Sequence, residues 1–204
     1  MQLIIGFSLE AIRKRLESLG ERVFFRRKFE NEQALRAFAR QCAYIEDPEH
    51  LREETLRELR LHTDTPAVAF YWHENMQTYE RLAWKGADDY PGTLDGDDRA
   101  VVALRAERET ISLHELASTL GENGIVLPML VRGELLGFVV IANRPGEDFP
   151  YDERALLGHL VHQVGAAMLA LRARANALLV GAIAKGSLSE AEARERARIL
   201  MSSD

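Results

Sequence analysis

The sequence predicts an α+β fold in which helices cover an antiparallel sheet. Apolar residues recur with a helical period up to about residue 63, with a strand period from residue 67, and with a helical period again from residue 152. Two pairs of neighbouring strand segments are typical of β-hairpins, in which the two strands run antiparallel. Because the apolar side of such a sheet must be buried, a helical layer is expected on at least one face.

Composition limits the class of protein. The chain has 204 residues, of which 47% are hydrophobic and 28% charged, so we expect a soluble protein with one core and helical arms. The net charge is −6; the first 40 residues hold nine Lys/Arg and five Asp/Glu, a balance of +4, which leaves −10 on the remainder. An acidic body argues against nucleic-acid binding.

The single cysteine, Cys42, excludes an intramolecular disulfide and a multi-cysteine metal site, which suits a reducing cytoplasm. Its helical spacing with Leu35, Phe38 and Ile45 favours a buried core thiol over a nucleophile.

Three helical segments are expected before the sheet. The first carries the a/d seam of a short coiled coil, formed by Leu9, Ile12, Leu16, Leu19 and Val23. A second follows over residues 31–45. In the third, Asp47 is the expected cap, Pro48 the first-turn proline, and the helix should end near Thr63.

The sheet elements follow in order. Residues 67–73 and 78–84 are typical of a first hairpin, and residues 85–98 of a loop. The stretch "DRAVVALRAERE" (98–109) predicts a short helix capped by Asp97 or Asp98. Residues 110–116 form a weak strand. The strongest hairpin is "GIVLPMLVRGELLGFVVIANR", with its turn around Gly133.

A closing helix is expected from Asp152 to Leu171, with a continuation to Leu178 also open. Gly181 and Gly186 should break it, and Ser189 with Glu192 forms a capping box for a last short helix.

The run "VLPMLVRGELLGFVVIANRPGEDFPYDERALLGHLVHQVGAAM" resembles the end of a GAF domain, with a proline-containing strand, a turn at a glycine, a "LLG" entry to the next strand and a closing helix. The resemblance covers about residues 35–171. The segment "ERVFFRRKFENEQALRAFARQCAYIEDPEHL" is similar to the cytoplasmic stretch that enters the GAF domain of some bacterial membrane-tethered sensors and histidine kinases.

The resemblance implies a sensory or regulatory module, not an enzyme. It would comprise a signalling helix (1–30), a GAF domain (31–180) and a helical tail (181–204). N- and C-terminal helices would cover one face of the sheet and a ligand pocket the other, so that an input is relayed through dimeric terminal helices to an output outside this chain. A ligand-free dimerisation or protein-interaction module, its pocket filled by Trp72, Tyr79 and Met129, stays open as the alternative.

In that arrangement the pocket lies between the sheet and the 97–107 helix. Its expected lining residues are Tyr71, Tyr79, Trp84, Leu94, Val101, His114 and Met129. His114 could bind an anion or orient a neutral ligand, or could equally serve the fold through a backbone hydrogen bond. Ligand and cofactor are unknown at this stage.

The loop "NRPGEDFPYDE" approaches the motif of nucleotide-binding GAF domains, but its Phe-to-Asp spacing is one residue shorter. We therefore favour a structural role in which Arg144 pairs with Asp152. Likewise, capping is favoured over ligand contact for Asp97 and Asp98.

No catalytic residue or metal site is predicted. His159 and His162 lie on one side of the closing helix, but no third ligand is evident. The sequence contains no phosphate loop, nucleophile elbow or His-Glu metal helix. GAF-type methionine sulfoxide reductases need several cysteines, and one cannot form their disulfide.

A parallel homodimer is expected from two apolar stripes. One is the N-terminal seam; the other consists of Leu157, Leu160, Val164 and Leu171. Localisation is expected to be cytoplasmic. A soluble protein and the cytoplasmic part of an inner-membrane protein, with the basic arm facing the cytoplasm, both remain open.

Overall fold

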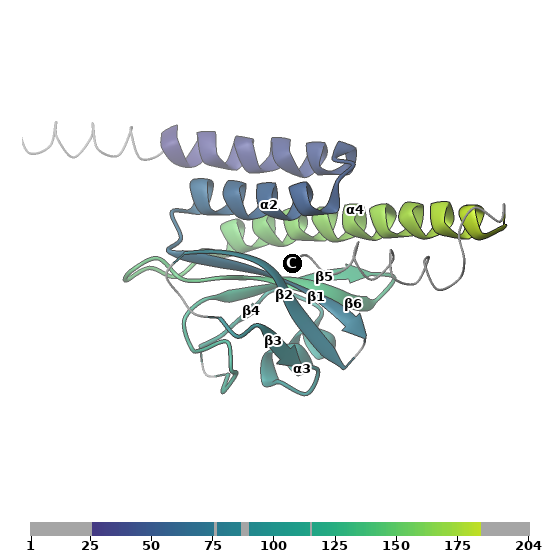
Figure 1. Ribbon diagram of the computed structural model, residues 1–204. Coiled ribbons are helices and arrows are strands. Elements are labelled where there is room, and N and C mark those ends of the chain that lie inside the picture. Colours follow the sequence, from purple (N-terminus) through teal and green to yellow (C-terminus); the bar gives the residue numbers. More distant parts are fainter. Residues whose placement is uncertain (1–25, 76, 87–89, 115, 185–204) are drawn as a thin grey trace, which may run out of the picture. The chain divides into compact units, whose positions relative to one another are not determined.

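The computed structural model describes residues 26–75, 77–86, 90–114 and 116–184 (Figure 1). The chain divides into two compact units, Met1–Ala34 and Leu35–Asp204. In the first unit, residues 26–34 are helical and Arg26 pairs with Glu30 at 2.9 Å. The predicted seam Leu9–Val23 lies outside the described residues. Everything that follows concerns the second unit, which begins with helical residues 35–41.

A short 3-10 helix, η1 (Cys42–Tyr44), leads to helix α2 (Pro48–Thr63). The predicted start of α2 is confirmed: the side chain of Asp47 accepts a hydrogen bond from the His50 N–H at 2.7 Å, and Pro48 opens the first turn. The helix ends at Thr63 because Asp64 adopts a left-handed conformation, with φ of 52°.

Six strands form one antiparallel sheet in the order β3-β2-β1-β6-β5-β4. The confirmed hairpins are β1–β2 and β5–β6. The strands are β1 (Ala67–Asn75), β2 (Thr78–Gly86), β3 (Thr93–Asp95), β4 (Ile111–Ser112), β5 (Ile125–Val131) and β6 (Glu134–Ile141). The loop predicted over 85–98 therefore contains a strand, β3, while the weak strand predicted over 110–116 shrinks to two residues.

The β5–β6 turn is the predicted one. Arg132 and Gly133 both have positive φ, 54° and 83°, which is the geometry of a two-residue hairpin turn whose twist matches the strands. The pairing of β1 with β6, from Val68 opposite Ile141 to Trp72 opposite Gly137, joins the two hairpins at the centre of the sheet.

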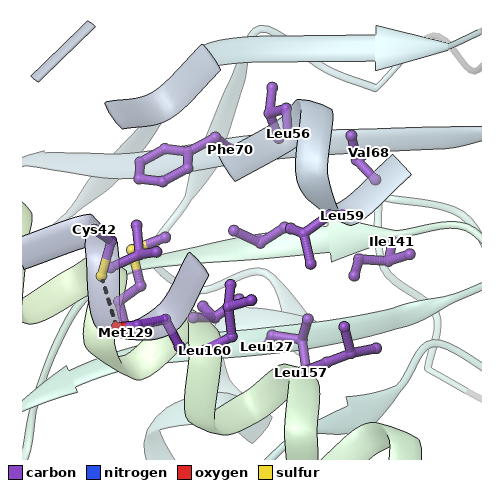
Figure 2. Close-up of a cluster of buried hydrophobic side chains, with 14 of the residues drawn as sticks. Cys42, Leu56, Leu59, Val68, Phe70, Leu127, Met129, Ile141, Leu157 and Leu160 are labelled. Atoms are coloured by element: carbon purple, nitrogen blue, oxygen red, sulfur yellow. Dashed lines mark hydrogen bonds between the residues drawn. The ribbon is translucent and has the colours of Figure 1, made fainter. Parts of the chain in front are cut away.

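Helices η1, α2 and α4 (Tyr151–Ala184) cover one face of the sheet, and α3 (Arg99–Glu107) covers the other (Figure 1). We call these the helical face and the α3 face. Figure 2 shows the buried cluster of the helical face, to which η1 and α2 and the central strands contribute together with α4; its labelled members are Cys42, Leu56, Leu59, Val68, Phe70, Leu127, Met129, Ile141, Leu157 and Leu160. The predicted α+β architecture is confirmed.

The closing helix α4 is longer than predicted. It runs for 34 residues without interruption, so Gly181 does not break it. A glycine lowers helix stability by only about 1 kcal/mol relative to alanine, and the surrounding alanines and leucines offset this. The proposed helix around Ser189 lies outside the described residues.

The two halves of α4 differ in burial. Leu157, Leu160 and Val164 have no exposed surface and pack in the chain's own core, whereas Leu178 and Val180 are 69% and 65% exposed. This corrects the placement expected for Leu157, Leu160 and Val164, because fully buried side chains cannot form a contact between subunits. Leu171 remains partly exposed.

Among the described residues, one helix, Tyr151–Ile183, is long and apolar enough to cross a membrane by length and composition alone. A helix that is mostly buried in the core of a soluble domain can pass the same test, but only 11% of the 18-residue stretch that meets it here is buried.

Two glycines of α4 provide a matched test of its packing. A Cβ on Gly165 would lie 2.7 Å from the Cβ of Met129 on β5, whereas a Cβ on Gly181 would meet nothing within 4 Å. Gly165→Ala should therefore lower the free energy of unfolding by about 1–3 kcal/mol. Gly181→Ala should leave it unchanged or raise it by up to about 1 kcal/mol. Urea denaturation measures both; equal effects would contradict this account of the α4–β5 contact.

Candidate functional site

The α3 face brings four of the seven predicted pocket residues together. Tyr71 of β1, Tyr79 of β2, Leu94 of β3 and Val101 of α3 all belong to the core cluster of that face, and none is more than 2% exposed. Phe138 of β6 lies among them, with its ring centroid 4.9 Å from that of Tyr71 and 5.2 Å from that of Tyr79. Packed rings thus occupy the space in which the pocket was expected.

Both tyrosine hydroxyls are engaged inside the protein. The hydroxyl of Tyr71 donates to the carbonyl of Pro91 at 2.5 Å, and that of Tyr79 donates to the carbonyl of Leu135 at 3.1 Å. Arg105 of α3 donates to the Tyr79 hydroxyl at 3.3 Å. Burial raises the pKa of both tyrosines, because an ionised phenolate would lose its hydration. Both are therefore neutral structural groups at physiological pH.

The other three predicted pocket residues lie elsewhere. Trp84 is 53% exposed, with the guanidinium of Arg81 stacked 4.4 Å from its ring centroid. His114 is exposed beyond β4, where its backbone N–H donates to the Ser112 hydroxyl at 3.3 Å. Met129 belongs to the core of the helical face (Figure 2). The placement expected for Met129 is wrong because strand residues alternate between faces, and Leu127 and Met129 of β5 both point toward the helices.

Asp98 fixes the start of α3, as the capping interpretation predicts. Its carboxylate accepts hydrogen bonds from the N–H groups of Ala100 at 2.9 Å and Thr119 at 3.0 Å, and from the Ser118 hydroxyl at 2.7 Å. Burial acts to raise the pKa of Asp98, but the hydrogen bonds outweigh it and hold the pKa below its usual value. The carboxylate is therefore committed to tying α3 to the segment after β4.

The loop before α4 is held by Arg144, with a different partner from the one expected. Its Nη2 pairs with the carboxylate of Glu153 at 2.7 Å, and its guanidinium lies 5.0 Å from the ring centroid of Phe149. Asn143 donates to Asp148 at 2.7 Å. The predicted pinning of the loop to the helix start holds, but through Glu153 rather than Asp152, because a residue one position along the helix points in a different direction.

No cluster of three or more potential metal ligands occurs in the described part of the chain. His159 and His162 are both exposed. Cys42 has no exposed surface, and its thiol donates to the carbonyl of Ala39 at 3.2 Å. Burial raises the pKa of the thiol, so the reactive thiolate is disfavoured.

Sequence reasoning missed the residue at the centre of the α3-face cluster, Phe138. The sequence does contain a signal, because residues two apart on a strand share a side, and Phe138 lies two residues before Val140. In the structure, Val140 pairs with Ala69 of β1. The pairing of β1 with β6 was needed to see that this side faces α3.

The fold and site define a class of protein: a small α+β domain with a six-stranded antiparallel sheet between terminal helices and one short helix. The matching sequence family is the GAF domain, whose model covers residues 47–168. The chain therefore belongs to the GAF domain family, a mainly sensory and regulatory group. The matched segment lies inside the domain range 31–180 expected from the sequence.

Solved structures with the same fold share little sequence with this chain. The GAF domain of an Acinetobacter phosphoenolpyruvate-protein phosphotransferase is 19% identical, with a TM-score of 0.59 over 69% of this chain and 93% of that one. A free methionine-R-sulfoxide reductase from Neisseria meningitidis is 16% identical (TM-score 0.59; 71% and 91% covered). Residues 122 to 287 of a methyl-accepting chemotaxis protein are 13% identical (TM-score 0.54; 66% and 96% covered).

These likenesses establish the fold alone, since a reductase and a chemotaxis protein both occur among them. No protein in the curated set matches the chain significantly.

Alkaline unfolding tests the buried tyrosines. Their pKa values are higher in the folded than in the unfolded chain, so the stability that neutral Tyr71 contributes is complete below pH 10 and is lost as the pH rises further. Tyr71→Phe should cost about 1–3 kcal/mol at pH 7, because the Pro91 carbonyl loses its donor. Between pH 10 and 12 its stability should fall less steeply than that of the wild type.

Tyr44, which is 85% exposed, supplies the control. Tyr44→Phe should change neither the free energy of unfolding at pH 7 nor its decrease between pH 10 and 12. Urea denaturation at each pH measures both. If the free energy of unfolding of Tyr71→Phe falls as steeply with rising pH as that of the wild type, a group other than Tyr71 causes the loss of stability.

Proposed function

We propose that this chain is a sensory or regulatory GAF domain that relays an input through its terminal helices to an output outside the chain. The observation that carries the proposal is the continuity of α4. One helix of 34 residues packs on the sheet with its first half and extends beyond the family-matched residues with its second. A displacement of the sheet would thus reach the end of α4 through a single rigid element.

Close packing between α4 and the sheet supports this relay. Gly165 allows the helix backbone to approach Met129 of β5 so closely that no Cβ would fit. Farther along, Arg174 pairs with Glu46, which joins the second half of α4 to the segment before α2 at 3.2 Å. Packed interiors have little freedom to absorb a shift, so motion of β5 should move α4 rather than dissipate between them.

The exposed half of α4 favours a homodimer. Leu178 and Val180 present apolar surface that the described residues leave uncovered, and Leu171 is partly exposed. Burying such surface in a second copy would be favourable. The N-terminal seam, which includes Leu16 and Leu19, would add a second contact region.

An interaction module without a small ligand is the second candidate function. The observation that favours it is the packing of Tyr71, Tyr79 and Phe138 in the space expected for a pocket on the α3 face. In this reading α4 would serve only to join subunits.

Enzymatic activity is not part of the proposal. The chain has one cysteine, Cys42, which has no exposed surface, and burial raises the pKa of its thiol, so the thiolate that redox chemistry would need is disfavoured. We place the module in the bacterial cytoplasm, as a soluble protein or as part of a membrane-tethered sensor of the two-component type.

Single-cysteine crosslinking tests the proposed dimer. In a Cys42→Ala background, Leu178→Cys should form an intermolecular disulfide on mild oxidation and give a denaturing-gel band at twice the 23.0 kDa chain mass. Val102→Cys on α3, at a side chain 51% exposed, is the matched control and should not crosslink. Light scattering that returns a 23.0 kDa monomer at micromolar concentration would defeat the dimer.

Thermal-shift screening separates the two functions. A ligand that binds only the folded state raises the unfolding midpoint by an amount set by its concentration relative to its dissociation constant. The sensor proposal expects at least one midpoint increase across a panel of metabolites, nucleotides and haem. If none moves the wild-type midpoint while the Leu178→Cys crosslink still forms, the interaction module is the better account.

A further inference from the structure

Two cavities of the described chain adjoin α4. The first, of about 430 Å³, opens on the helical face; its walls are mainly apolar and include Trp72 and Leu82, with the buried Arg52 beside them. Nothing in the described residues indicates which molecule would fill it. The second, of about 420 Å³, lies at an edge of the sheet and has mixed polar and apolar walls. We call it the edge cavity. Its volume falls within the range of small-molecule sites, roughly 300–1,000 Å³.

The edge cavity lies where β5 loses its outer neighbour. β4 pairs with β5 only at Ile125 and Val126, so no described strand covers the outer edge of β5 from Leu127 to Val131. Pro128 and Leu130 of β5 line the cavity. Its other walls come from the segment that follows α3 and from the first half of α4.

Pro128 makes this edge unsuitable for an added peptide strand. A proline is tolerated within a strand where its nitrogen faces an open edge, and it has no N–H to donate there. A strand that paired with this edge would therefore lack a ladder hydrogen bond at Pro128. The cavity is better suited to a small molecule than to an extended peptide.

Cationic side chains outnumber anionic ones around the edge cavity. Arg108 and Arg154 line it together with one carboxylate, that of Glu109. None of the three forms an ion pair with a residue that the structure describes. Nearby in α4, Glu153 is paired with Arg144 and does not line the cavity. Two arginines and one glutamate leave a formal charge of +1 on the lining, with histidine counted as neutral.

The two arginines reach the cavity from different elements. Arg108 caps the end of α3 with a positive φ of 58°, and its guanidinium lies near the β5–β6 turn, since a Cβ on Gly133 would be 3.7 Å from its Nη1. Arg154 comes from α4, and its Nε is buried with no hydrogen-bond partner among the described residues. A guanidinium whose hydration is restricted in this way gains more from an added anion than a fully exposed one does.

Neutral donors complete the lining. Thr110 offers a hydroxyl, Tyr151 a phenol and His162 a ring N–H. Thr110 lies close to α4, since a Cβ on Gly158 would be 3.1 Å from its Oγ1. Donors thus come from both the segment after α3 and α4, which favours a head group whose oxygens point in several directions.

We propose that the edge cavity binds a small organic phosphate, with the phosphate held between Arg108 and Arg154 and the apolar part packed on Pro128 and Leu130. A phosphomonoester carries about −1.5 to −2 charges at pH 7 and three strong acceptor oxygens, so it can accept from two arginines and a hydroxyl at once. The planar donor pairs of arginine match such oxygens. The binding itself does not depend on the relay, so it goes beyond the function proposed above.

Such a ligand would contact both helical layers. Arg108 belongs to the end of α3, and Arg154 belongs to the half of α4 that packs on the sheet. One molecule would therefore join the two layers at the edge of β5, where the described strands leave them unconnected.

Phenyl phosphate is a suitable probe, because it joins a phosphate head group to a single apolar ring. Isothermal titration calorimetry should show saturable binding, and the unfolding midpoint should rise with the concentration of phenyl phosphate. Inorganic phosphate and phenol, which each represent one half of the probe, should both bind more weakly.

Arg154→Met should weaken phenyl phosphate binding at least about tenfold, because a charge-assisted contact is lost while most of the aliphatic side chain is kept. Arg60→Met on α2 removes an exposed cation that does not line the cavity; as the matched control, it should leave the affinity unchanged. Ala155→Tyr should fill the cavity and abolish binding, whereas Ala166→Tyr, at an exposed position of α4 outside the cavity, should not. Circular dichroism establishes that the variants are folded.

Three results would overturn the proposal: no saturable heat with phenyl phosphate, an equal affinity for phenyl phosphate and either of its halves, or equal effects of Arg154→Met and Arg60→Met. If Arg154→Met changes the oligomeric mass rather than the affinity, a second copy of the chain occupies the cavity and the proposal is also wrong. Binding of phenyl phosphate that leaves Leu178→Cys crosslinking unchanged would uphold the site and count against the relay.

Discussion

The two central strands, β1 and β6, are buried on both faces, and the rest of the domain depends on their pairing. Each contributes alternate side chains to two separate cores, one under the terminal helices and one under α3. Gly137 makes the pairing possible opposite Trp72, because a Cβ there would lie 2.4 Å from the Tyr71 carbonyl oxygen. A sheet with both faces buried needs two helical layers, which explains why so small a domain has helices on either side.

This shared pair of strands also connects the two faces mechanically. In β1, Tyr71 packs toward α3 while the neighbouring Phe70 and Trp72 pack toward α2 and α4. A strand cannot move toward one face without changing the packing on the other. The helical face contains the cavity lined by Trp72 and Arg52, whereas packed aromatic rings fill the α3 face around Phe138. In this chain, therefore, space for a ligand and contact with the long helix occur on the same side.

Membership of the GAF family does not by itself assign a ligand. The GAF domain of a phosphotransferase, a methionine sulfoxide reductase and part of a chemotaxis protein share the fold with this chain at identities of 19% or less. What this chain offers is its own side chains, among them the buried single cysteine Cys42 and the buried Arg52 beside an apolar cavity. Function must be argued from these groups.

The sequence by itself determined the local elements, because their signals are local. Asp47 and Pro48 start α2, Arg132 and Gly133 make the hairpin turn, and Asp98 caps α3, each through contacts within a few residues. The strand β3 carried no such signal, since three residues form it only by pairing with β2.

Only the tertiary structure decided which face each strand residue occupies and whether a cavity remains there. The predicted pocket set mixed Tyr71 and Tyr79 with Met129, which lies on the other face, and it omitted Phe138. The alternation of side chains along a strand predicts that neighbouring residues point to opposite sides of the sheet, but it does not predict which side faces α3. The side that faces α3 depends on the pairing of β1 with β6, which joins residues about 70 positions apart. The cavity beside Arg52 arises in the same way, from helices and strands that meet only in the folded chain.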